Sequence, residues 1–164
     1  MRKLALILVL PLVFSVAHAV TFTDFYAVFV DIPGWEAESP TGQETVMPMG
    51  KVVFAERHYS KGDKSFTARV VVGPVAMTFS NVFMSTIEYR NDEGMLKNAS
   101  VKGFKAKIVY NFKERAGYVA VLLTKAVAPY VMVFEFENMD YNEALSLANK
   151  FPVGRAARLV RNFM

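Results

Sequence analysis

The chain has 164 residues and no cysteine, and 53% of its residues are hydrophobic, with 14 phenylalanines and 7 tyrosines. This composition excludes a disordered chain and a small scaffold held by disulfides, so a hydrophobic core must hold the fold together. A formal net charge of +4 lacks the strong basic bias of nucleic-acid-binding proteins, and we expect no nucleic-acid partner.

The first nineteen residues have the three parts of a secretory signal peptide. Arg2 and Lys3 form a basic start, Leu4–Val16 is an apolar run, and Ala17 and Ala19 give the small-x-small cleavage pattern. The apolar run is shorter than the roughly 20 residues that a membrane-spanning helix needs. We expect cleavage after Ala19, a periplasmic or secreted protein and no stable membrane anchor; an uncleaved anchor is the alternative.

Cleavage after Ala19 removes two of the 19 basic residues and none of the 15 acidic residues, so the mature net charge is +2. Residues 20–164 are enough for one hydrophobic core and too few for two ordinary domains. We therefore expect a signal peptide over residues 1–19 and a single globular domain over residues 20–164.

The first elements of the mature chain are predicted from residue type and turn signals. Residues 20–30 are rich in β-branched and aromatic side chains and predict a strand that ends at the turn 31–34. Residues 35–38 predict a second, short strand. Residues 43–50 contain Pro48 and Gly50 and are expected to form a loop.

A β-hairpin and a helix follow. Residues 51–59 and 65–72 are strand-like runs joined by the polar link 60–64, which predicts a hairpin. Over residues 75–89 the apolar positions recur with the spacing of an amphipathic helix. These positions are Phe79, Val82, Phe83, Thr86 and Ile87.

Three strands and a terminal helical region complete the chain. Residues 104–113 alternate and predict one core face and one solvated face, whereas residues 118–123 are apolar on both faces and predict a central strand. Residues 130–137 form the third strand. Asp140 and Glu143 then form a capping-box pattern at the start of a helix over 141–151, and residues 153–164 make a further turn or two.

This order predicts an α+β fold, a mostly antiparallel sheet with helices packed on it. The layout resembles the PsbP-like α/β/α sandwich superfamily of small exported domains. The resembling features are the strand end at Pro33-Gly34-Trp35, the hairpin over 51–72, the middle helix, the meander and the segment 143–151. The resemblance implies a binding or accessory role in an extracytoplasmic space and carries over no catalytic residue.

His58, Ser60 and Asp63 are the candidates for a hydrolytic site, because His58 is the only histidine after cleavage. No Gly-x-Ser-x-Gly nucleophile motif accompanies them. We expect His58 to be a strand histidine that pairs with a neighbour. One histidine without cysteine also disfavours a zinc site.

Carboxylates offer two further candidate sites. Glu135 and Glu137 share one strand face, as do Lys105 and Lys107, and we expect cross-strand charge pairing there rather than acid–base chemistry. Asp92 and Glu93 precede a glycine, yet the spaced ligands of a calcium loop are missing.

Methionines and arginines give two candidate contact surfaces. Met47 and Met49 in the expected loop and Met77 and Met84 on the expected helix form a cluster if the loop folds over the helix. Such a cluster can bind Cu(I), but packing or an adaptable binding surface is the expected role. The C-terminal stripe of Arg155, Arg158 and Arg161 can face anionic lipid or an acidic partner, and a solvated helix face is expected.

The sequence therefore predicts an exported, non-enzymatic domain that binds an envelope protein or a small ligand, or supports an envelope assembly. We assign no catalytic, cofactor-binding or metal-binding residue, and the sequence does not determine the oligomeric state. The alternatives are an envelope hydrolase that uses His58 and a methionine-based copper carrier or a lipid carrier.

Overall fold

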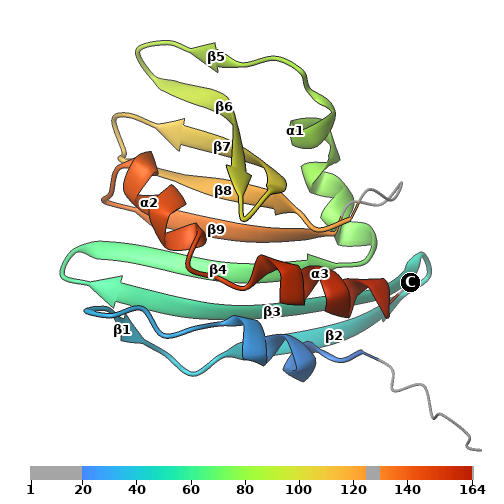
Figure 1. Ribbon diagram of the computed structural model, residues 1–164. Coiled ribbons are helices and arrows are strands. Elements are labelled where there is room, and N and C mark those ends of the chain that lie inside the picture. Colours follow the sequence, from blue (N-terminus) through green and yellow to red (C-terminus); the bar gives the residue numbers. More distant parts are fainter. Residues whose placement is uncertain (1–19, 125–129, 164) are drawn as a thin grey trace, which may run out of the picture.

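The computed structural model describes residues 20–124 and 130–163; residues 1–19, which carry the predicted signal peptide and its cleavage site, lie outside this part. The described residues form a nine-stranded sheet whose neighbouring strands all run antiparallel, with helices packed on it (Figure 1). The expected α+β class and antiparallel sheet are confirmed.

The strands are β1 (Glu36–Ala37), β2 (Thr41–Met47), β3 (Gly50–Lys61), β4 (Lys64–Val72), β5 (Tyr89–Arg90), β6 (Gly94–Val101), β7 (Phe104–Asn111), β8 (Ala116–Leu122) and β9 (Val131–Glu137). The helices are the 3₁₀ helices η1 (Phe22–Val28) and η2 (Pro74–Phe79) and the α-helices α1 (Ser80–Met84), α2 (Tyr141–Ala148) and α3 (Val153–Arg161).

The last strand of the chain lies in the middle of the sheet. The spatial order is β1-β3-β4-β9-β8-β7-β6-β5, and β2 pairs with β3 as well. Strand β9 thus joins the hairpin β3–β4 to the meander β6–β8. None of the helices in the described residues is long and apolar enough to cross a membrane.

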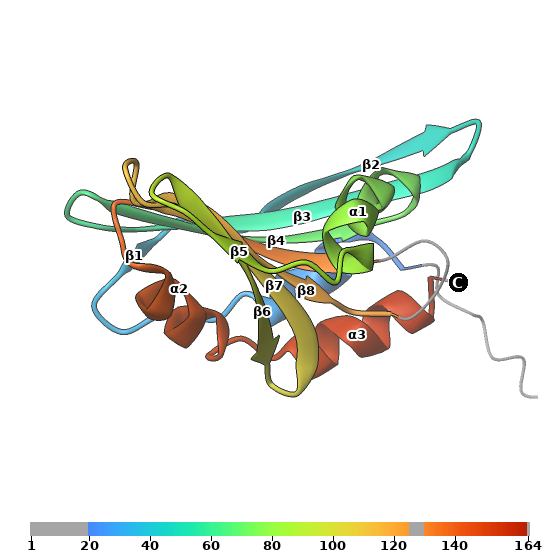
Figure 2. The same cartoon turned by 90° about the horizontal axis from the view of Figure 1, so that it is seen from above.

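Helices lie on both faces of the sheet, as the doubly apolar strand β8 predicts. Helices α2 and α3 lie on one face, here called the inner face, and α1 lies on the opposite, outer face (Figure 2). Helix η1 packs on the inner face with α3, and η2 packs on the outer face with α1.

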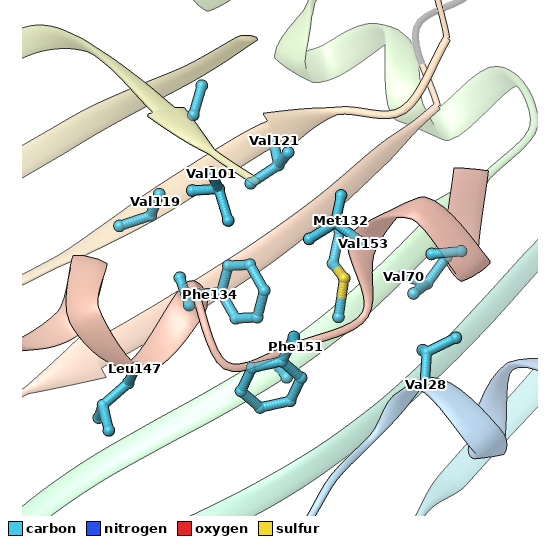
Figure 3. Close-up of a cluster of buried hydrophobic side chains, with 14 of the residues drawn as sticks. Val28, Val70, Val101, Val119, Val121, Met132, Phe134, Leu147, Phe151 and Val153 are labelled. Carbon is cyan, nitrogen blue, oxygen red and sulfur yellow. The ribbon is translucent and has the colours of Figure 1, made fainter. Parts of the chain in front are cut away.

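The main core lies between the sheet and the inner helices (Figure 3). Phe134 of β9 stacks on Phe66 of β4 at 5.7 Å between ring centroids, and Phe151 from the turn between α2 and α3 lies 5.0 Å from Phe134. All three side chains are fully buried. Burial of an aromatic side chain of this size contributes about 1.5–3 kcal/mol, so Phe151 fastens the helical layer to the sheet.

Several predicted elements are confirmed. The hairpin over 51–72 is β3–β4, with a two-residue turn at Gly62 and Asp63 instead of the five-residue link. Asp140 caps α2, and its Oδ1 accepts from the backbone N–H of Asn142 at 2.8 Å. The carboxylate of Glu143 does not complete the capping box but pairs with Lys64 at 2.8 Å.

The prediction of a strand over 20–30 is wrong, because this segment contains the helix η1. The carboxylate of Asp24 accepts from the backbone N–H of Thr21 at 2.7 Å and so closes the first turn. Phe25 and Val28, three residues apart, then both enter the core. The β-branched and aromatic residues around them give this segment the composition of a strand, but it forms a helix and does not pair with a strand.

The loop expected over 43–50 is also wrong. Residues 41–47 form β2, paired along its whole length with β3, and Pro48 lies in the tight turn between these two strands. Pro48 and Gly50 therefore mark a tight turn between two strands and not a loop over the whole of 43–50. Strand β6, which was not predicted, is a weakly apolar strand near the sheet edge, where three of the eight positions are exposed.

The middle helix is shorter than the predicted 75–89. Phe83 is buried against the outer face, as the periodicity predicts, but α1 ends at Met84 and Ser85 is extended. Ile87, which the stripe would bury, is 66% exposed. The helical spacing of apolar residues therefore extends further along the sequence than the part of the segment that packs on the sheet.

Candidate functional site

The outer face of the sheet is covered only in part. Helices η2 and α1 bury Val71, Ala120, Val131 and Val133 with their own Ala76 and Phe83. Further along β3, β4 and β9, towards the β3–β4 turn, the outer-face side chains are polar. We call this region the polar field; its members are Glu56, His58, Ser60, Ser65, Thr67, Arg69, Glu135 and Glu137.

Register brings the polar field together from three strands. His58 of β3 is opposite Thr67 of β4, which is opposite Glu135 of β9. Because successive side chains of a strand point to opposite faces, Arg69 lies on the same face as Thr67. The field is therefore complete only once β9 has paired with β4.

Arg69 joins the three strands through two ion pairs. Its Nε donates to Glu56 Oε2 at 2.6 Å, and its Nη1 donates to Glu135 Oε1 at 2.8 Å. Arg69 and Glu56 are each 28% exposed, so the pairs are partly shielded from water. The expected cross-strand pairing is confirmed for Glu135, with Arg69 as its partner. It is wrong for Glu137, which forms no ion pair within the described residues.

His58 pairs with its cross-strand neighbour, as the sequence predicts. Its Nδ1 lies 2.8 Å from Thr67 Oγ1, and its Nε2 lies 3.5 Å from Glu56 Oε1. Within residues 20–124 and 130–163, neither Ser60 nor Asp63 is hydrogen-bonded to His58. The hydrolytic trio considered from the sequence is thus not assembled in this structure.

A cavity of about 620 Å³ opens over the polar field. Its charged lining consists of Glu36, Glu38, Glu135 and Glu137, and His58, Ser60, Ser65 and Thr67 add polar groups. We call it the acidic cavity. A second hollow of about 470 Å³ lies over Glu56 and Arg69 towards β2.

The wall that carries Glu36 and Glu38 is fixed by two inner-face residues of β3. Arg57 pairs with Asp31 at 2.8 Å and donates to the carbonyl of Glu38 at 2.7 Å. The hydroxyl of Tyr59 donates to the carbonyl of Val30 at 2.9 Å. Burial raises the pKa of Tyr59 to about 12, although the positive charge of Arg57 acts to lower it.

Of the four carboxylates that line the acidic cavity, only Glu135 forms an ion pair within the described residues. Three carboxylates therefore face the cavity without a cation. The described residues contain no group of three or more potential metal-ligating histidine or acidic side chains. The arrangement suits a ligand that brings its own positive charge.

Lys107 lies where the sequence predicts a solvated side chain, and this prediction is wrong. Its side chain is fully buried, and its Nζ donates to the carbonyl of Ser85 at 2.9 Å. Lys105, which is exposed, donates to the carbonyl of Phe83 at 3.2 Å. The two lysines bind the carbonyl end of α1 and hold it on the outer face, a favourable place for a cation.

The other candidates lie apart from the acidic cavity. Met47 and Met49 occupy the β2–β3 turn region, Met77 and Met84 lie on η2 and α1, and all four are exposed.

Arg155, Arg158 and Arg161 form the exposed side of α3, as predicted. The other side of α3 is buried. In the segment of Asp92 and Glu93, the side chain of Asn91 accepts from two backbone N–H groups and forms a turn.

No protein-family model, curated protein or solved structure matches this chain. The function is therefore argued from the residues alone. The sequence singled out His58, Glu135 and Glu137, but it missed Glu36, Glu38, Glu56 and Arg69. The available signal was the period-2 spacing of Glu56 with His58 and of Thr67 with Arg69.

Proposed function

We propose that this protein is an exported binding domain whose acidic cavity receives a positively charged group, carried by a small ligand or by a partner protein. The observation that carries the proposal is the lining of the cavity. Four carboxylates surround it, and three of them have no ion-pair partner within the described residues.

Charge complementarity favours an amine or a guanidinium. Hydrogen bonds between charged partners are shorter and stronger than neutral ones. Glu36, Glu38 and Glu137 are exposed, so water and salt screen each contact. We therefore expect weak binding of a single amine, tighter binding of a ligand with several positive charges, and a steep loss of affinity with salt.

The floor of the cavity is arranged before a ligand arrives. Arg69 holds Glu135 in place, and His58 is held by Thr67. A preformed site loses less entropy on binding than a flexible one. The hydroxyls of Ser60 and Ser65 add groups that can orient the ligand.

Two further considerations favour a binding role over the alternative hydrolase. His58, the base that a hydrolase would use, is hydrogen-bonded to Thr67 rather than to Ser60. The layout that resembles PsbP-like domains also implies a binding or accessory role, and the predicted signal peptide supports a role outside the cytoplasm.

The experiment measures the binding of spermidine and of a tri-lysine peptide to the protein by isothermal titration calorimetry. The test variant is the triple substitution Glu36→Gln, Glu38→Gln and Glu137→Gln. The matched control, Asp92→Asn, Glu93→Gln and Glu114→Gln, removes the same charge from exposed positions at other turns.

We expect the wild type and the control to bind alike and the cavity variant to bind at least about tenfold more weakly, a loss of about 1.4 kcal/mol. Equal affinities in the cavity variant and the control would show that only net charge matters. That result, or an absence of binding to the wild type, would contradict the proposal.

A further inference from the structure

The tip of the β2–β3 hairpin presents exposed apolar side chains. Val46 and Met49 are 84% and 76% exposed, and Met47 between them is exposed as well. We call these three residues the apolar end. Isolated exposed hydrophobic residues are ordinary, but a group of large ones marks a contact surface.

The two ends of the described chain lie at this same end of the molecule. Lys51, two residues after the turn of the β2–β3 hairpin, donates from its Nζ to the carbonyl of Val20 at 3.1 Å. The same Nζ lies 6.0 Å from the centre of the Phe163 ring. Both views show the hairpin turn and the C-terminal end of α3 on the same side of the molecule (Figures 1 and 2).

The charge of the neighbouring helix α3 indicates what this end meets. Arg158 and Arg161 are exposed in the last turns of α3, next to Phe163. Apolar side chains beside exposed arginines are the combination that binds the interface of an anionic bilayer.

The shape of the hairpin agrees with a bilayer. The β2–β3 hairpin extends past the rest of the sheet, and its turn is the outermost part of that end in Figure 2. A projecting tip with Val46 and Met49 can enter the fluid interface of a membrane. Methionine suits such a surface, since its flexible thioether side chain adapts to irregular contacts.

We propose that the apolar end binds the surface of an anionic lipid bilayer, with Val46 and Met49 inserted at the interface and Arg158 and Arg161 against lipid phosphates. This contact is peripheral and requires no spanning segment. It is independent of the proposed function, because the acidic cavity lies near the opposite end of β3, about 35 Å away at 3.3 Å per residue. The acidic cavity would then lie at the end of β3 that is remote from the membrane.

The test is sedimentation of residues 20–164, which include every described core residue, with vesicles of phosphatidylcholine and phosphatidylglycerol. The test variant is Val46→Asp with Met49→Asp, and the matched variant is Val46→Leu with Met49→Leu. Ala37→Asp adds a negative charge at an exposed site on β1 as a further control. Both turn residues are exposed, so circular dichroism is expected to show unchanged folding.

A second readout locates the contact. The chain has no cysteine, so Val46→Cys and Ala37→Cys each provide a single site for an environment-sensitive fluorophore. We expect a blue shift on vesicle addition at position 46 and none at position 37. Vesicles without phosphatidylglycerol lack net negative charge, and a double Arg158→Gln and Arg161→Gln variant lacks the arginines that would meet it. We expect weaker partition in both cases, and unchanged partition in both would contradict the role of the arginines.

The proposal predicts that the wild type, the leucine variant and Ala37→Asp partition alike and that the aspartate pair partitions at least about tenfold less. Equal partition of the aspartate pair, absence of wild-type binding, or no blue shift at position 46 would overturn it. A concentration-dependent dimer that the aspartate pair abolishes, in the absence of vesicle binding, would assign the apolar end to a second copy of the chain instead.

Discussion

Tyr59 links the wall of the acidic cavity to the stability of the fold. Its ring is almost wholly buried, and its hydroxyl donates to the carbonyl of Val30 at 2.9 Å. Tyr59→Phe removes this hydrogen bond and keeps the buried ring. A typical buried hydrogen bond contributes about 1 kcal/mol, so we expect the variant to be less stable by about that amount near neutral pH.

The difference between wild type and variant must change at alkaline pH. Burial raises the pKa of Tyr59 to about 12 in the folded protein, from 10.0. Between these two values the unfolded chain has released the proton and the folded protein has kept it, so the unfolded state binds fewer protons. The stabilising contribution of Tyr59 is therefore complete below about pH 10 and falls as the pH rises towards 12.

At about pH 11 the loss of stability from Tyr59 amounts to about 1.4 kcal/mol. The Tyr59→Phe variant has no ionisable group at this position, so this loss does not occur in it. Other tyrosines and lysines titrate in both proteins, so the difference between the two free energies of unfolding isolates Tyr59. The assay is urea unfolding followed by circular dichroism at about pH 8 and about pH 11. We expect the disadvantage of the variant to vanish or reverse at the higher pH; a disadvantage that is the same at both values would refute the burial argument.

The other predictions concern the polar field and the local backbone, and urea unfolding tests each of them. Arg69→Met removes two partly shielded ion pairs and should cost about 1–2 kcal/mol, less in about 1 M salt; a cost that salt leaves unchanged would contradict the electrostatic explanation. Gly73 has φ +100, and a Cβ there would lie 2.2 Å from the carbonyl oxygen of Lys51, so Gly73→Ala should cost about 3 kcal/mol. Its control, Gly154→Ala in α3, meets nothing within 4 Å and should stabilise by up to about 1 kcal/mol; equal effects at the two glycines would count against the structure of the β4–η2 connection. Asp140→Ala removes the cap of α2 and should cost about 1 kcal/mol, and no cost would mean that the cap does not contribute.

The parts of the fold that could be predicted are those with local signals. The β3–β4 hairpin shows strand-like runs on both sides of a polar turn, and Asp140 marks the start of α2. Strands β7, β8 and β9 likewise carry alternating or continuous apolar patterns. In each case the residues that decide the structure are neighbours in sequence.

The segment over 20–30 and the burial of Lys107 could not be predicted in this way. The segment has strand-forming composition, but the helix η1 places Phe25 and Val28 in a core built by other elements. Lys107 alternates like a solvated residue, and only the docking of α1 above it makes it buried. Tertiary packing overrides local preference at both places.

The candidate site was predicted only in part for the same reason. His58 and Glu135 are distinctive in the sequence, but Glu36 and Arg69 become notable only when they share a surface with them. That surface depends on the pairing of β9 with β4, which joins segments far apart in the chain. No local pattern encodes this pairing.

The most direct test of the proposed function is nuclear magnetic resonance of the ¹⁵N-labelled protein during titration with a tri-lysine peptide. The account predicts that the backbone amides of Glu36, Glu38, Thr67 and Glu137 shift together in a saturable and salt-sensitive way, and that these shifts disappear in the Glu36→Gln, Glu38→Gln and Glu137→Gln variant. Saturable shifts at other sites, or none at all, would contradict the assignment of the acidic cavity as the binding site.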